Sequence, residues 1–227
     1  MHDAPRENLL GTRRFSPFFW TQTLGAFNDN VFKNALVILV SFGIAGLSQD
    51  QINLYVNLAA GLFILPFFLF SATAGQLAEK YEKSRLIRWI KLAEIGIMAL
   101  GVAGLYLGSV PFLLGVLFLL GAQATIFGPV KYSILPQALH PSELITGNAW
   151  VEAATFLAIL LGTMLGGWLI AQTFGVAGVS AVVVAVATLG YVTARALPAA
   201  PAAAPDLKVN WNAITEPGRN IAFMRGH

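Results

Sequence analysis

The chain has 227 residues, of which 56% are hydrophobic and only 11% are charged. A soluble domain carries about 25% charged residues, so this composition excludes an ordinary soluble globule as well as a disordered chain. The absence of cysteine excludes disulfides and thiolate chemistry, and the small net charge of +3 does not indicate a nucleic-acid partner.

Apolar stretches of about the length that a bilayer requires follow one another along the chain. They lie at residues 18–47, 54–78, 86–107, 111–135, 144–172 and 176–197. Backbone groups in lipid must be paired within the segment, so stretches of this length are expected to be helices. The sequence therefore predicts an all-α integral membrane protein, a six-transmembrane-helix bundle over residues 18–197. A leader (1–17) precedes it, and a Pro/Ala-rich linker and tail (198–227) follow.

Among the segments that flank and connect the spans, lysine and arginine occur in only one set. They occur in the leader (Arg6, Arg13, Arg14), in the second loop (Lys80, Lys83, Arg85, with Arg88 just beyond) and in the tail (Arg195, Lys208, Arg219, Arg225). The first, third and fifth loops contain none, and the fourth loop, ALHPSE, is assigned to the Lys- and Arg-bearing side only by counting crossings. The positive-inside rule therefore places both termini and the second loop in the cytoplasm.

The first span is interrupted by a polar run, AFNDNVFKNA. It contains Asn28, Asp29, Asn30, Lys33 and Asn34. Asp29 lies near the middle of the bilayer, about 21 Å along the helix from residue 15, where an ionisable group marks a binding site or pathway by default. The alternative is structural: Asp29 and Lys33 are four apart and can neutralise each other as a local ion pair.

The fourth and fifth spans add further polar residues. Gln123 precedes a Gly128-Pro129 step that predicts a kink, and Lys131 follows it. Lys131 either extends to the membrane interface or faces a water-filled cavity. In the fifth span Asn148 and Glu152 share one face, and Glu152 is a plausible partner for Lys131.

Two other features of the spans favour structural roles. Gly162, Gly166 and Gly167 form a small-residue surface that is typical of close helix packing. Lys91 and Glu94, three apart near the inside end of the third span, are interpreted as a structural pair.

No catalytic pattern is found in the sequence. The three histidines, His2, His140 and His227, lie in termini or loops, and no phosphate-binding glycine motif occurs. We therefore predict a protein that is not an enzyme and uses no metal and no cofactor.

The second loop, residues 75–85, reads GQLAEKYEKSR. It resembles the loop between the second and third helices of the major facilitator superfamily. The resemblance assigns a gating role to Gly75, Glu79, Lys80, Lys83 and Arg85. This loop has Glu79 where the family usually has aspartate and Glu82 where it usually has glycine.

Three further stretches resemble the lysophospholipid transporter branch of that superfamily: AFNDN (26–30), GPVKYSILPQ (128–137) and NAWVEAATFLAILLGTMLGG (148–167). The resemblance implies inward transfer of lysophospholipids across the bacterial inner membrane, with membrane lipid around the protein. It also implies a partner acyltransferase/acyl-carrier-protein synthetase that re-acylates the substrate. Asp29 and Lys131 would line the central cavity, and Glu152 would lie beside a lateral opening.

Such transporters have twelve helices, so the resemblance implies that this chain is the amino-terminal half of the fold. The other half is expected from a carboxy-terminal segment or from a second copy. Two other functions stay open from the sequence. One is transport of a different amphiphile or drug, and the other is a non-transporting membrane anchor for an acyltransferase.

Overall fold

The computed structural model describes residues 8–44 and 46–210, and within them the chain forms six long helices and no strand. The helices are α1 (Ser16–Ile38), α2 (Gln49–Lys80), α3 (Lys83–Leu107), α4 (Val110–Ala138), α5 (Leu144–Ile170) and α6 (Gly175–Arg195). Three short helical segments flank them, at Leu9–Gly11, Leu39–Gly43 and Pro141–Glu143. Residues discussed above that lie outside this part of the chain are His2, Arg6, Arg219, Arg225 and His227.

Five of these helices, α2 to α6, are long and apolar enough to cross a membrane, which makes the chain a multi-pass membrane protein. α1 is not among them, because the polar run around Asp29 lowers its hydropathy. Its 23 residues would still extend about 35 Å, so the sixth crossing stays a prediction.

Local sequence signals set several helix ends. α2 begins at Gln49, earlier than the predicted residue 54, because Ser48 and Gln51 form a capping box. α4 stays helical through Pro129 and Pro136 and ends at Ala138, beyond the predicted residue 135. The apolar pattern finds the spans, and the caps decide where the helices end.

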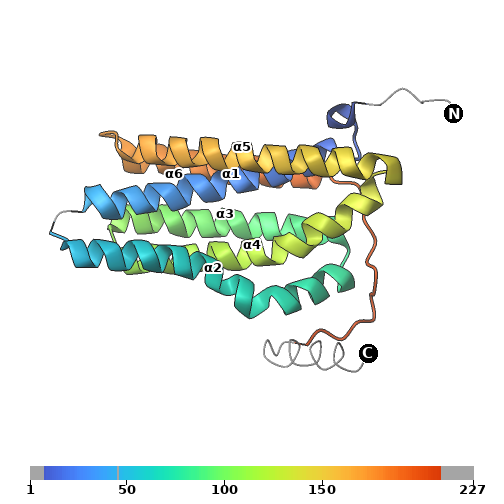
Figure 1. Ribbon diagram of the computed structural model, residues 1–227, viewed down its shortest axis with the longest axis horizontal. Coiled ribbons are helices and arrows are strands. Elements are labelled where there is room, and N and C mark those ends of the chain that lie inside the picture. The colour runs from blue at the N-terminus through green and yellow to red at the C-terminus, as the bar shows by residue number, and fades with distance from the viewer. Residues whose placement is uncertain (1–7, 45, 211–227) are drawn as a thin grey trace.

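The helices run side by side along the bundle in Figure 1, and most of the packed pairs are not consecutive in sequence. α1 packs against α5 and α6, α2 against α4, and α3 against α4 and α6. α1 and α5 touch through their backbones: a Cβ on Gly162 would lie 2.5 Å from the Phe27 carbonyl oxygen, and one on Gly166 would lie 2.3 Å from that of Val31. The packing interpretation of these glycines is confirmed.

Two apolar clusters fill the bundle, one towards each end. Phe32 of α1 and Leu117 of α4 belong to the first, and Phe18 of α1 and Ile134 of α4 belong to the second. Between these positions, α1, α3 and α4 carry buried polar residues. We call Asn28, Lys91, Glu94 and Gln123 the polar layer. The bundle is therefore apolar at both ends of its interior and polar in the middle.

Residues 196–210 follow α6 as an extended segment, which we call the strap (red-brown in Figure 1). It is hydrogen-bonded to the α2–α3 connection. The backbone N–H of Lys83 donates to the Ala200 carbonyl oxygen at 2.9 Å, and that of Ala203 donates to the Glu79 carbonyl oxygen at 3.0 Å. The predicted linker therefore begins as a docked segment, and we call this end of the bundle the strap end.

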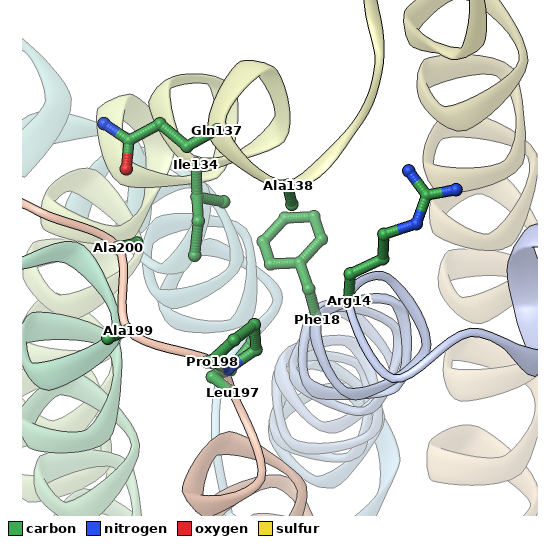
Figure 2. Close-up of a pocket in the computed structure, with 9 residues that line it drawn as sticks. All are labelled: Arg14, Phe18, Ile134, Gln137, Ala138, Leu197, Pro198, Ala199 and Ala200. Atoms are coloured by element: carbon green, nitrogen blue, oxygen red, sulfur yellow. The ribbon is translucent and has the colours of Figure 1, made fainter.

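The strap also contacts the ends of α1 and α4 (Figure 2). Pro198 lies near Phe18 and Ile134 beside a hollow of about 30 Å³. From α4, Gln137 Nε2 donates to the Pro201 carbonyl oxygen at 3.2 Å. The strap thus joins parts of α1, α2, α3 and α4 that are distant in sequence.

Glu82 is one of several side chains that anchor the strap, beside Gln137 and Lys83. Its carboxylate accepts hydrogen bonds from the backbone N–H groups of Ser84 at 3.1 Å, Arg85 at 2.7 Å and Ala200 at 2.7 Å. Burial by itself raises the pKa of Glu82, but the three N–H donors outweigh it and hold the pKa below its ordinary value of 4.5. The ionised carboxylate is therefore the form that holds the strap.

We expect Glu82→Gln to loosen the strap, because a neutral amide oxygen is the weaker acceptor. Protection of the Ala200 amide from hydrogen exchange should fall about tenfold, the lower end of the effect of a hydrogen bond to a charged group. A carboxyl group whose pKa is lower in the folded state stabilises the fold at pH values above its ordinary pKa. This stabilisation is lost as the pH falls through the pKa of the folded state. Protection in the unchanged protein should therefore decline as pH falls below 4.5. Hydrogen exchange with mass spectrometry, corrected for intrinsic rates, measures both effects.

Glu79→Gln is the matched control for this experiment. Glu79 holds the strap through its backbone carbonyl oxygen, which the substitution does not change. An equal loss of protection in both variants would contradict the role assigned to the Glu82 carboxylate.

Candidate functional site

The polar residues of α1 form hydrogen bonds to different elements, namely α3, α5 and α1 itself. Asn28 Nδ2 donates to Glu94 Oε1 of α3 at 3.1 Å, and Asn34 Nδ2 donates to a carbonyl oxygen of α5 at 2.7 Å. Asn30 Nδ2 donates to a carbonyl oxygen of its own helix at 2.7 Å. Only part of the polar run is therefore available to one shared site.

Asp29 and Lys33 do not form the local ion pair that the sequence offered as an alternative. Lys33 Nζ lies 4.9 Å from the ring centre of Phe63 in α2, in a cation–π contact. Within the described part of the chain, no ion pair joins Lys33 to Asp29. The Lys33 ammonium group is therefore in direct contact with an aromatic ring and not with the Asp29 carboxylate.

Glu94 is the centre of the polar layer. Its carboxylate accepts from Lys91 Nζ at 2.6 Å, from Asn28 Nδ2 at 3.1 Å and from Gln123 Nε2 at 3.2 Å. The Lys91 and Glu94 side chains are only 2% and 1% exposed. A charge pair this deeply buried is tolerated only when hydrogen bonds also satisfy it, as the two amides do here.

The sequence analysis recognised Lys91 and Glu94 as a pair but placed them near the inside end of their helix. The structure joins them to the polar layer. Glu94 is 11 residues beyond the first residue of α3, about 16 Å of helix. The same depth estimate that singled out Asp29 would have found Glu94.

Gly25 of α1 leaves the space that Lys91 occupies. A Cβ at this position would lie 2.2 Å from Lys91 Nζ and 3.8 Å from Glu94 Oε2. The missing side chain lets the ammonium group approach the α1 backbone. Gly25 thus contributes to the site because its lack of a side chain makes room for the Lys91 ammonium group, a role that the sequence analysis did not detect.

A cavity of about 340 Å³ lies beside the polar layer and is lined by α1 to α5. Its polar lining consists of Gln22, Asp29, Lys91, Glu94, Gln123, Lys131, Tyr132 and Thr155. Phe67 and Phe127 contribute aromatic rings to its wall. Carboxylates and ammonium groups therefore face one space whose surroundings are otherwise apolar.

Two buried acceptor atoms of α1 have no hydrogen-bond partner within the described residues: Asp29 Oδ1 and Asn28 Oδ1. An acceptor without a partner in a low-dielectric interior costs about 1–3 kcal/mol. Since Asp29 also lines the cavity, its carboxylate can receive a hydrogen bond or a positive charge from a bound molecule.

Lys131 and Glu152 form an ion pair between α4 and α5. Lys131 Nζ lies 3.0 Å from Glu152 Oε1, which also accepts from the Tyr132 hydroxyl at 3.3 Å. The pairing suggested by the sequence is therefore present. Lys131 lines the cavity, which agrees with the cavity-facing alternative for this residue.

Other predicted site residues lie outside the cavity lining. Asn30 and Asn148 donate to carbonyl oxygens of their own helices, and Lys33 contacts Phe63. Glu152 is connected to the site through Lys131 and Tyr132, which both line the cavity. Thr155 was not predicted but lines the cavity and is hydrogen-bonded to Gln22.

The predicted gating residues have separate roles in the structure. Lys83 is buried, and its Nζ donates to the Pro201 carbonyl oxygen of the strap at 3.2 Å. Gly75 lies inside α2, with no atom within 4 Å of an added Cβ. Lys80 and Arg85 line a hollow at the α2–α3 connection. Within residues 8–44 and 46–210, no group of three His, Asp or Glu side chains could hold a metal ion.

Comparison with known proteins places these features in context. Residues 18–224 match the profile of the Major Facilitator Superfamily. Over 146 residues the chain is 32% identical to the lysophospholipid transporter LplT of Escherichia coli strain SE11 and of Shigella boydii serotype 18, and 33% identical to that of Escherichia coli O1:K1. The alignment covers 64% of this chain and 34% of each relative. The chain thus spans about a third of the length of the curated relatives it matches.

Proposed function

This chain belongs to the major facilitator superfamily, and from this premise we propose that it forms one side of a transport pathway for lysophospholipids. The observation that carries the proposal is the mid-bundle cavity, where Asp29 and Glu94 face the same space as Lys91 and Lys131. A zwitterionic head group has a phosphate for the ammonium groups and an amine for the Asp29 carboxylate. The similarity to proteins named lysophospholipid transporters supports this substrate class.

The proposed mechanism is alternating access. In this mechanism the bundle rocks against a facing unit while the polar head stays at the membrane centre. The direction is inward across a bacterial inner membrane, with both termini in the cytoplasm, so that a partner acyltransferase/acyl-carrier-protein synthetase can re-acylate the product.

We further propose that the facing unit is a second six-helix half or a second copy of the chain. The bundle leaves large apolar side chains of α2 and α5 uncovered, with Phe68 79% exposed and Phe156 70% exposed, and in the proposed assembly the facing unit covers them in place of lipid. The greater length of the relatives is consistent with a facing half, since the chain spans about a third of it.

Asp29→Asn tests the proposed function. The substitution keeps size and removes the charge that would pair with the substrate amine. Uptake of lysophosphatidylethanolamine by the transport assembly should fall at least tenfold, while the amount of protein in the membrane stays unchanged. Uptake of radiolabelled substrate into proteoliposomes, normalised to inserted protein, measures the effect.

Asp50→Asn is the matched control, because it removes the same charge from the first turn of α2, outside the cavity. It should leave uptake unchanged. Full uptake by Asp29→Asn would contradict the proposal. Recovery of uptake in Asp29→Asn with Lys33→Met would also contradict it, since it would reveal a structural pair.

A further inference from the structure

A second hollow, of about 410 Å³, lies at the α2–α3 connection and shares no lining residue with the central cavity. It is lined by Lys80, Tyr81, Glu82, Arg85, Leu86 and Trp89. The hollow thus combines two cations and one carboxylate with two aromatic rings and one aliphatic side chain. The proposed transport function uses none of these side chains.

The charges of this hollow favour an anion. Neither Lys80 nor Arg85 has a carboxylate within ion-pair distance among the residues that the structure describes. The carboxylate of Glu82 also lines the hollow, but it is engaged by three backbone N–H donors. The hollow therefore has two cations against one carboxylate, an excess of one positive charge, and neither cation is held in an ion pair within the described residues.

The aromatic residues indicate that the hollow lies at the surface of the membrane. Trp89 is 60% exposed and Tyr81 is 47% exposed, and such rings concentrate where lipid head groups meet the hydrocarbon. Leu92, Leu100 and Leu107 lie on the same face of α3 as Trp89, and all three are exposed. An apolar stripe therefore runs from the hollow along the helix into the membrane.

We propose that this hollow binds the anionic phosphodiester head group of a membrane phospholipid, and we call it the α2–α3 lipid site. Lys80 and Arg85 contact the phosphate, while the acyl chains lie along the stripe that begins at Trp89. Charge complementarity selects the head group. The apolar stripe favours a membrane lipid over a free anion, because inorganic phosphate has no acyl chain that could pack against it.

The first test compares phosphatidylglycerol with phosphatidylcholine. Each lipid is added to the purified 227-residue chain in detergent, and bound lipid is counted by native mass spectrometry. Phosphatidylglycerol should bind more tightly than phosphatidylcholine. Lys80→Gln with Arg85→Gln should weaken phosphatidylglycerol binding roughly 25-fold, since each basic residue at a membrane surface contributes about fivefold.

Two control variants accompany the charge-removing pair. Lys80→Arg with Arg85→Lys keeps both charges and should keep binding. Arg195→Gln removes a cation from the end of α6, outside the hollow, and should also keep binding. Equal phosphatidylglycerol binding with and without the two charges would overturn the proposal, as would equal affinity for phosphatidylcholine.

The second test locates the lipid without altering a charge. Brominated phosphatidylglycerol should quench tryptophan fluorescence of the unchanged protein more than it quenches Trp89→Phe. Brominated phosphatidylcholine should quench the two proteins equally. Millimolar inorganic phosphate should not relieve the quenching by phosphatidylglycerol. Relief of the quenching by phosphate would assign the hollow to a free anion. Equal quenching of the unchanged protein and of Trp89→Phe by brominated phosphatidylglycerol would place the lipid elsewhere. Either result overturns the proposal.

Discussion

Glu94→Leu is expected to destabilise the bundle by about 3–5 kcal/mol, because it leaves the Lys91 ammonium group buried without a carboxylate. The two amides that donate to Glu94, from Asn28 and Gln123, would lose their acceptor at the same time. Unfolding in mixed micelles with increasing fractions of denaturing detergent measures the loss. Lys91→Met should be damaging as well, since it strands the carboxylate.

The double variant Glu94→Leu with Lys91→Met is the informative comparison. Replacing a buried ion pair by apolar side chains is often close to neutral, so the double variant should recover most of the stability. The two amides without an acceptor account for what is not recovered. If the losses of the two single variants simply add, the pair does not interact, and the central role of Glu94 is wrong.

Gly166→Val is expected to separate α1 from α5 and to cost about 1–3 kcal/mol or more. The Cβ would lie 2.3 Å from the Val31 carbonyl oxygen, a backbone atom that cannot rotate away as a side chain can. The helices must move apart along their whole contact, which also disturbs the cavity between them. The detergent-unfolding assay and lysophospholipid uptake should both register the change.

Gly96→Val serves as the control. Gly96 lies within α3, and no atom lies within 4 Å of a Cβ built there. Both substitutions change helix propensity equally, so their difference isolates the contact between α1 and α5. Equal effects would show that propensity, and not backbone approach, limits the position.

Much of the fold could be predicted because the bilayer imposes a length on each apolar segment. All six predicted spans correspond to long helices of the described chain. The ends of the helices could not be predicted from hydropathy. Capping by Ser48 extends α2, and α4 continues through Pro136 where the apolar run has already ended.

The site was predictable where a polar residue stood out from an apolar background. Asp29, Gln123 and Lys131 were found in this way, and all three line the cavity. Lys91 and Glu94 stood out equally, but their spacing of three residues was interpreted as a local ion pair that needs no further partner. Its participation in a layer shared with α1 and α4 depends on helix packing, which one sequence does not encode locally.

The strap was only half predictable. Its composition of proline and alanine indicated a linker, but the docking of that linker depends on Glu82. In the sequence Glu82 was a departure from a glycine that the family usually has there. The structure assigns this departure a function, because a carboxylate at this position caps α3 and binds Ala200.

The packing of α1 has a consequence for how the protein is made. Asn34 is hydrogen-bonded to a carbonyl oxygen of α5 that lies 129 residues later in the chain. At synthesis rates of about 5–20 residues per second, α1 leaves the ribosome on the order of ten seconds before this partner exists. During that interval the Asn34 amide lacks this acceptor, and a helix as polar as α1 partitions poorly into lipid alone. We therefore expect α1 to reach its final position in the membrane only after α5 has been synthesised.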